Sequence, residues 1–219
     1  LSTSGGIRVL ANGGNATISA PLTIGAAQTW DVDPTGSLTV SGDTTFTSSV
    51  TKTNSGTLTL SGNNSGSGAI TLAGGTLNIN SAAALGSGIF TVGAGTTINT
   101  PSGAIALANN NAQVWNGDYT FTGTNNLDLG TGGVTLGNSL TLTAAASELT
   151  VGGIIGDGGN NRGITKAGAG TLILNGSNTY TGPTAITNGN IRVTNNASLG
   201  TVAGGVSQSG TSFLELDGS

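Results

Sequence analysis

The stretch that decides the fold is residues 164–200, which read ITKAGAGTLILNGSNTYTGPTAITNGNIRVTNNASLG. It aligns without gaps on residues 50–86, and each residue of the first copy lies 114 positions before its partner in the second. The matching positions are glycines at expected turns and leucines at expected inward sites, for example Leu58 with Leu172. Because such positions carry structure, we infer that the fold itself repeats.

Along the whole chain, including these copies, apolar residues recur at every second position in short bursts. This is the period of a β-strand with one apolar and one polar face. Clusters of Gly, Asn, Ser and Asp lie between the bursts and are typical of turns. No stretch repeats apolar residues at helical spacing over three turns, so the sequence predicts an all-β fold. Examples of the bursts are Thr57–Leu60, Thr76–Asn80, Leu127–Leu129, Leu140–Leu142 and Leu149–Val151.

The spacing of the bursts fits a sandwich, a barrel or a solenoid. Two features favour the solenoid: aromatic residues make up only 4% of the chain, and the outward positions are mostly Thr, Ser and Asn. Charges stacked one strand apart would repel each other, which explains a charged fraction of 6%. At about 20 residues per coil, we expect roughly ten coils in a single continuous β-solenoid over residues 1–219.

Composition excludes several classes of function. Leu, Ile, Val and Phe number 50 of 219 residues and the net charge is −4, whereas disordered chains combine few aliphatics with high charge. Five cations cannot form a nucleic-acid-binding stripe. The chain has no Cys or His, so the usual zinc ligands and Ser–His–Asp catalysis are missing. It has no long apolar run for a membrane helix, and its lack of Met indicates a processed or excised piece.

The second copy resembles a known family most closely in Lys166–Thr184 and Asn188–Val193. These segments resemble the autotransporter-associated β-strand repeat of bacterial passenger domains. The first copy departs from it at Thr53–Ser55 and Ser65–Ser67, while Ala27–Trp30 and Ala112–Trp115 are similar to the run-in to such repeats. The resemblance implies a secreted right-handed parallel β-helix with a role in adhesion, aggregation or surface display.

A few polar residues are candidates for chemistry. Asp31 and Asp33 could hold calcium or act as an acid/base pair, or could be outward residues before a turn. Asp157 lies in a sequence similar to a calcium nonapeptide, but one imperfect copy favours a loop. Lys52 and Lys166 occupy equivalent repeat positions, which favours a structural role. Gly93–Gly95 and Gly168–Gly170 precede strands rather than helices, so we interpret them as turns and not as phosphate loops.

The remaining charged, aromatic and threonine residues are expected to be structural. Asp128, Glu148 and Glu215 are predicted to be isolated outward charges, with Arg8 and Arg192 placed likewise. The four aromatics are predicted to cap coil ends or cover strand edges, with sugar stacking as the alternative. Thr-x-Thr triplets would suit ice binding, but irregular coil spacing argues against one continuous ladder. The aromatics are Trp30, Trp115, Tyr119 and Tyr180, and the triplets are Thr45/Thr47, Thr57/Thr59, Thr120/Thr122, Thr141/Thr143 and Thr179/Thr181.

The sequence therefore predicts a non-enzymatic structural module of a bacterial secreted or cell-surface protein. It would be a stalk or adhesin passenger, or a filament subunit that assembles head to tail, located outside the cell. Expected partners are other copies or further repeats at the solenoid ends, with surface glycans as another candidate, and no nucleic acid. We expect no catalytic residue, cofactor or metal. The alternative is a β-helix that binds or cleaves polysaccharides.

Overall fold

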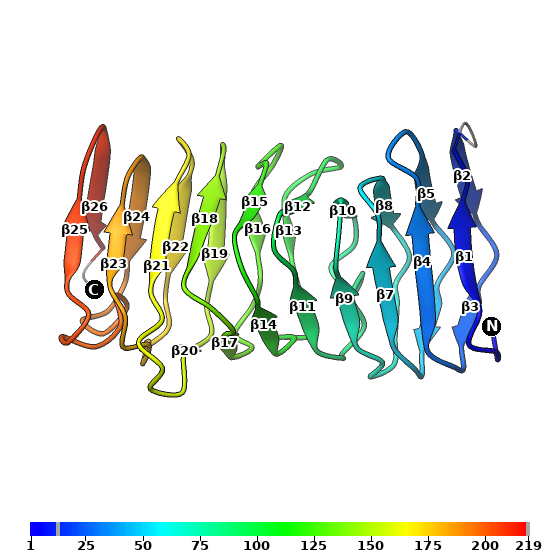
Figure 1. Cartoon of the computed structure of the whole chain (residues 1–219), viewed down its shortest axis with the longest axis horizontal. Coiled ribbons are helices and arrows are strands. Elements are labelled where there is room, and N and C mark those ends of the chain that lie inside the picture. Colours follow the sequence, from blue (N-terminus) through cyan, green and yellow to red (C-terminus); the bar gives the residue numbers. More distant parts are fainter. Residues whose placement is uncertain (12–13, 218–219) are drawn as a thin grey trace.

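Every regular element in the described residues, 1–11 and 14–217, of this computed structural model is a β-strand. The strands follow one another in coils along one axis, with the N-terminal coil at one end and the C-terminal coil at the other (Figure 1). Most of the coils contribute a strand to each of two or three stacked sheets, called here sheets I, II and III. A small fourth sheet pairs β3 (Leu22–Ile24) with β6 (Thr44–Phe46).

Sheets I, II and III have eight, ten and six strands. Sheet I contains β1 (Gly6–Val9), β4 (Gln28–Val32), β7 (Val50–Thr53), β9 (Ile70–Leu72), β11 (Phe90–Val92), β14 (Gln113–Trp115), β17 (Val134–Leu136) and β20 (Ile155–Gly156). Sheet II contains β2 (Asn15–Ile18), β5 (Ser37–Val40), β8 (Thr57–Leu60), β10 (Thr76–Ile79), β12 (Thr96–Asn99), β15 (Tyr119–Phe121), β18 (Leu140–Ala144), β21 (Ile164–Ala167), β23 (Thr184–Ile186) and β25 (Val206–Gln208). Sheet III contains β13 (Ile105–Ala106), β16 (Leu127–Asp128), β19 (Glu148–Val151), β22 (Thr171–Leu174), β24 (Gly189–Val193) and β26 (Ser212–Leu216).

All strand pairs are parallel, and each strand pairs with its counterpart in the next coil. In sheet II, for example, Leu58 lies opposite both Leu38 and Leu77. Ten strands in sheet II correspond to ten coils, which at about 4.8 Å per strand make a rod about 45 Å long. The predicted parallel β-solenoid of roughly ten coils is confirmed.

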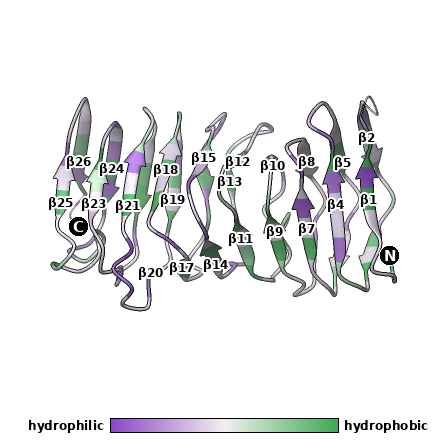
Figure 2. Cartoon of the chain, viewed as in Figure 1, coloured by the Kyte–Doolittle hydropathy of each residue, from purple (hydrophilic) through white to green (hydrophobic). Residues whose placement is uncertain are grey.

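Alternation along each strand sends one set of side chains inward and the other outward. The inward set stacks coil upon coil into a continuous buried column, which in sheet II runs through Leu38, Leu58, Leu77, Ile98 and Phe121. Both hydrophobic and hydrophilic residues occur in strands such as β1 and β7 (Figure 2). The burial of this column supplies the main stabilisation of the fold.

The predicted placement of the aromatic residues was wrong. Trp30, Trp115, Tyr119 and Tyr180 are all buried in the core, at 2% exposure or less. The ring of Trp115 meets that of Tyr119 edge to face, with centroids 5.3 Å apart. A few wide positions inside the solenoid therefore take large rings, and none of these four is available to stack on a sugar.

The Thr-x-Thr triplets do not share one ladder, because Thr45 lies in β6 of the small fourth sheet and Thr179 and Thr181 lie outside the strands. A different set of outward residues nevertheless stays in register. Partner residues in adjacent strands lie 19 to 24 positions apart, but the extra residues lie between strands, for instance in the segment 157–163 between β20 and β21. An outward column on sheet II therefore keeps its register through six successive coils. Its members are Ser37, Thr57, Thr76, Thr97, Thr120 and Thr143.

The two ends of the solenoid expose apolar side chains. At the C-terminal end, Phe213 is 65% and Leu216 is 77% exposed. A hollow of about 480 Å³ opens beside them and is lined in part by Val193, Leu199 and Leu216. The N-terminal end exposes Leu1 and Leu10.

The inward column gives a direct test of the fold. Replacing Leu77 by Ala removes a buried side chain that contacts both neighbouring coils, and should lower the free energy of unfolding by about 2–5 kcal/mol. The outward neighbour Thr76 provides the control, because Thr76→Ala should change the free energy of unfolding by less than about 0.5 kcal/mol. Guanidinium denaturation followed by circular dichroism measures both, and equal losses would contradict the inward assignment.

Candidate functional site

The two sequence copies occupy different faces of the solenoid. In the first copy, β7 and β9 belong to sheet I, whereas β8 and β10 belong to sheet II. In the second copy, the equivalent strands β21 and β23 belong to sheet II, whereas β22 and β24 belong to sheet III. Each copy therefore spans two coils at the junction between two sheets, here called a corner. The corner of the first copy joins sheets I and II, and the corner of the second copy joins sheets II and III.

A buried lysine holds each of these corners. Lys52 Nζ donates to the carbonyl oxygens of Thr53, Asn54 and Gly74, at 2.7 to 3.0 Å. Since Gly74 belongs to the next coil, the ammonium group ties the turns of two coils together. Lys166 makes the equivalent bonds to Ala167, Gly168 and Asn188.

The lysine stems lie in apolar columns of the core. Lys52 is flanked by Trp30 and Leu72 in sheet I, and Lys166 by Leu142 and Ile186 in sheet II. Burial lowers the pKa of Lys52 to about 8, against the attraction of Asp31, and lowers the pKa of Lys166 to about 8. The repeated contacts assign both lysines to the structure of the corner.

The turns that face these lysines require left-handed backbone. Gly75 and Gly189 are equivalent residues at the start of the second strand of the upper coil, with φ of 71° and 66°. A Cβ at either position would meet a carbonyl oxygen of the coil below. Glycine is needed here because other residues rarely adopt this conformation and no space exists for a side chain.

A buried asparagine completes each copy. Asn64 Oδ1 accepts from the amide of Thr44 in the preceding coil, and its Nδ2 donates to Ala84 O in the following coil. Asn178 spans three coils in the same way, through Ile155 N and Ser198 O. This asparagine is the middle residue kept between Asn63-Asn64-Ser65 and Ser177-Asn178-Thr179. No role was predicted for it, although this repetition is the signal that could have revealed one.

Asp157 organises the segment between β20 and β21. It is 1% exposed, and its carboxylate accepts bonds from Gly159 N, Arg162 N and Thr181 Oγ1. Burial alone raises the pKa of Asp157, but these hydrogen bonds outweigh it and hold the pKa well below its ordinary value. The carboxylate thus accepts hydrogen bonds from its own loop and from the next coil.

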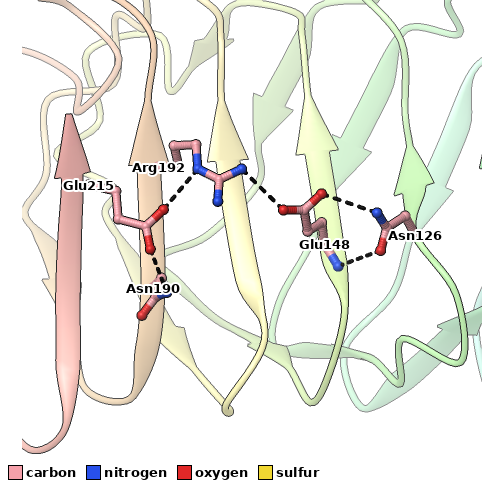
Figure 3. Close-up of polar contacts among 5 residues, drawn as sticks. All are labelled: Asn126, Glu148, Asn190, Arg192 and Glu215. Atoms are coloured by element: carbon pink, nitrogen blue, oxygen red, sulfur yellow. Dashed lines mark hydrogen bonds and ion pairs between the residues drawn. The ribbon is translucent and has the colours of Figure 1, made fainter. Parts of the chain in front are cut away.

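A charged network crosses the outward face of sheet III (Figure 3). Arg192 on β24 bonds Glu215 of β26 through Nε at 2.8 Å and Glu148 of β19 at 3.1 Å. Asn190 donates to Glu215, and Asn126 exchanges two bonds with Glu148. The prediction that Glu148 and Glu215 are isolated was therefore wrong. Their partners lie 22 to 44 positions away, so the local sequence could not reveal them.

The other predicted candidates are separated by the fold. Asp31 points outward and pairs with Arg8 at 3.2 Å, whereas Asp33 accepts from the amide and hydroxyl of Thr35 in the turn after β4. Asp128 likewise accepts from the amide of Gly130. Gly93–Gly95 and Gly168–Gly170 lie in turns or bends between strands.

The described part of the chain contains no group of three or more His, Cys, Asp or Glu side chains arranged to hold a metal ion. Within that same part, no helix has the length and apolar character needed to cross a membrane. Lys52, Lys166 and Asp157 each bond within their own turn and to a neighbouring coil. Asn64 and Asn178 bond to the coils on both sides. The lysine and asparagine bonds at the two corners hold neighbouring coils together. These two corners are also the segments that resemble known proteins.

A family model, the passenger-associated-transport-repeat, matches residues 50–79 and 164–193, the two corners just described. These two segments are similar to passenger-associated-transport repeats. An adhesin, the BmaC autotransporter of Brucella suis biovar 1 (strain 1330), is 38% identical over 119 residues, a match that covers 54% of this chain and 3% of that protein. No solved structure matches. The resemblance inferred from Lys166–Thr184 is thereby confirmed.

The corner lysines of the passenger repeats can be tested by substitution. Lys166→Met keeps the apolar stem but leaves three carbonyl oxygens without their donor, so the free energy of unfolding should fall by about 1–3 kcal/mol. Lys52→Met should cost a similar amount, because its contacts are equivalent. Arg8→Met, which removes an exposed cation, is the control in the same denaturation assay. A Lys166→Met protein as stable as wild type would contradict this role.

Asp157 predicts a pH dependence. A carboxylate with a depressed folded-state pKa stabilises the protein above its unfolded pKa of about 3.9, and this stabilisation is lost as pH falls toward the folded-state value. Asp157→Asn should lower the free energy of unfolding by about 1–3 kcal/mol at pH 7, and by less at pH 2. Denaturation curves at both pH values measure this difference, with Asp31→Asn as a control for lost charge. A difference that stays constant with pH would refute the assignment.

Proposed function

We propose that this chain is a rigid, non-enzymatic rod segment of a bacterial adhesive passenger, displayed outside the cell. The observation that carries the proposal is that strand ladders pass through both passenger repeats, with coil-spanning bonds at each corner. Continuous ladders resist bending because each coil is bonded to its neighbours. Residues 1–219 would then act as one unit that holds binding regions away from the cell surface.

A structural role fits the chemistry of the polar residues better than catalysis. The carboxylates of Asp33, Asp128 and Asp157 accept hydrogen bonds from their own turns. Glycosidases instead need two carboxylates facing one another across a substrate. No arrangement of that kind among the described residues favours the polysaccharide-cleaving alternative.

The ends of the rod are the proposed sites of contact with partners. Phe213, Leu216 and the hollow beside them present apolar surface next to the unpaired edge of β26. Such an edge is a template for another strand. We propose that it receives a coil of the same architecture, from further repeats of the same protein or from a second copy.

Electron microscopy and sedimentation of the isolated chain test the proposed function. We expect rods of uniform width, about 45 Å long as single units, that lengthen end to end as concentration rises. The double substitution Phe213→Asp and Leu216→Asp should abolish the lengthening and leave single rods, whereas Ile89→Asp, an exposed apolar position far from the ends, should not.

Two results would overturn parts of this proposal. Single rods at all concentrations would refute contact between copies through the ends, while particles bent at variable angles would refute the rigid rod. Release of reducing ends from acidic or neutral polysaccharides, abolished by Asp31→Asn with Asp33→Asn, would refute the non-enzymatic assignment.

A further inference from the structure

The outward surface of sheet II forms a two-dimensional array of small polar side chains, here called the threonine face. Its first column is the six-coil series of Ser37, Thr57, Thr76, Thr97, Thr120 and Thr143. A second column, two residues further along each strand, contains Thr39, Thr59, Asn78 and Asn99. Both columns consist of uncharged residues, although Arg, Lys, Asp and Glu occur elsewhere on the rod.

The fold sets the dimensions of this array. Adjacent strands place equivalent side chains about 4.8 Å apart, and residues i and i+2 lie about 6.7 Å apart along a strand. Because all pairs are parallel and in register, the two repeats persist together through the four coils that carry both columns. Both are close to the repeat distances between water oxygens on the surface planes of ice.

Five of the six hydroxyl groups of the first column are free to bind water, whereas that of Ser37 donates to Asn15 Oδ1. Those of Thr57, Thr76, Thr97, Thr120 and Thr143 have no hydrogen-bond partner among the described residues. A shallow hollow of about 240 Å³, lined in part by Thr97, Thr120 and Thr143 and also by Asp118, shows that solvent reaches them. Threonine is stiff at χ1, so its hydroxyl and methyl positions are largely fixed before any ligand arrives.

Sheet I offers an internal comparison. Its outward column Thr29, Thr51, Thr71 and Thr91 is also in register, but Val114 follows it and strands of three residues such as β9 and β11 place only one side chain outward. That column repeats in one direction only. The threonine face, with two outward columns side by side, repeats in two directions.

We propose that the threonine face orders water in an ice-like lattice and through it binds the surface of ice. The two neutral columns suit a neutral lattice, and the Asp118 carboxylate beside them accepts from the amide of Thr141. The hydroxyls supply hydrogen bonds in register, and the methyl groups between them leave the intervening water to bond with itself. Binding would not require any change in the protein, because the array is already rigid.

The proposal is tested with the whole chain in dilute buffer. Thermal hysteresis and inhibition of ice recrystallisation should both be detected, and fluorescently labelled protein should coat defined planes of a single ice crystal. Thr97→Lys, in the middle of the array, should reduce hysteresis by more than half because a long charged side chain keeps the lattice away. Thr91→Lys is the matched control on the outward face of sheet I and should leave hysteresis unchanged.

Circular dichroism and thermal melting of both variants show whether the solenoid is intact. A folded Thr97→Lys protein with full activity would overturn the proposal, as would equal losses in both variants. Wild-type protein that shows no hysteresis and is excluded from growing ice would also overturn it. These outcomes are independent of the rod and adhesin assignment, which is measured by particle shape and end-to-end contact.

Discussion

The structure depends on parallel, in-register stacking of one coil on the next. A single coil cannot bury its inward aliphatics by itself, so Leu77 is shielded only because Leu58 and Ile98 lie directly above and below it. The same stacking brings equal side chains close together on the outside. Charged side chains are disfavoured at these outward positions, whereas hydroxyl and amide groups are tolerated. This explains why the surface has few charged side chains.

Much of the fold could be predicted from the sequence, because the alternation of Thr57–Leu60 and the glycine spacing are local signals. The structural importance of Lys52, Lys166 and Asn178 could be predicted from their repetition alone. Their hydrogen bonds could not be predicted, because nothing in the sequence around a lysine among aliphatics shows that its ammonium group will meet three carbonyl oxygens. The Arg192 network was missed because its members meet only after several coils have formed.

Coil length varies along the chain, and from the sequence this argued against one continuous outward ladder. In the structure the extra residues are confined to the connections between strands, so faces stay regular while the interior varies in width. The interior therefore accepts Trp115 in one coil and Leu136 at the same position in the next, and the outward columns are undisturbed.

The change of face between the two passenger repeats has a consequence for how such rods vary. A corner held by its own lysine and asparagine does not depend on which sheets it joins, since the same bonds form between sheets I and II and between sheets II and III. Gain or loss of a segment shorter than a full coil would then rotate all the following coils about the solenoid axis, so that each of their corners joins the next pair of sheets. Lineages could re-aim distal surfaces by changing length, without altering any of the residues that those surfaces display.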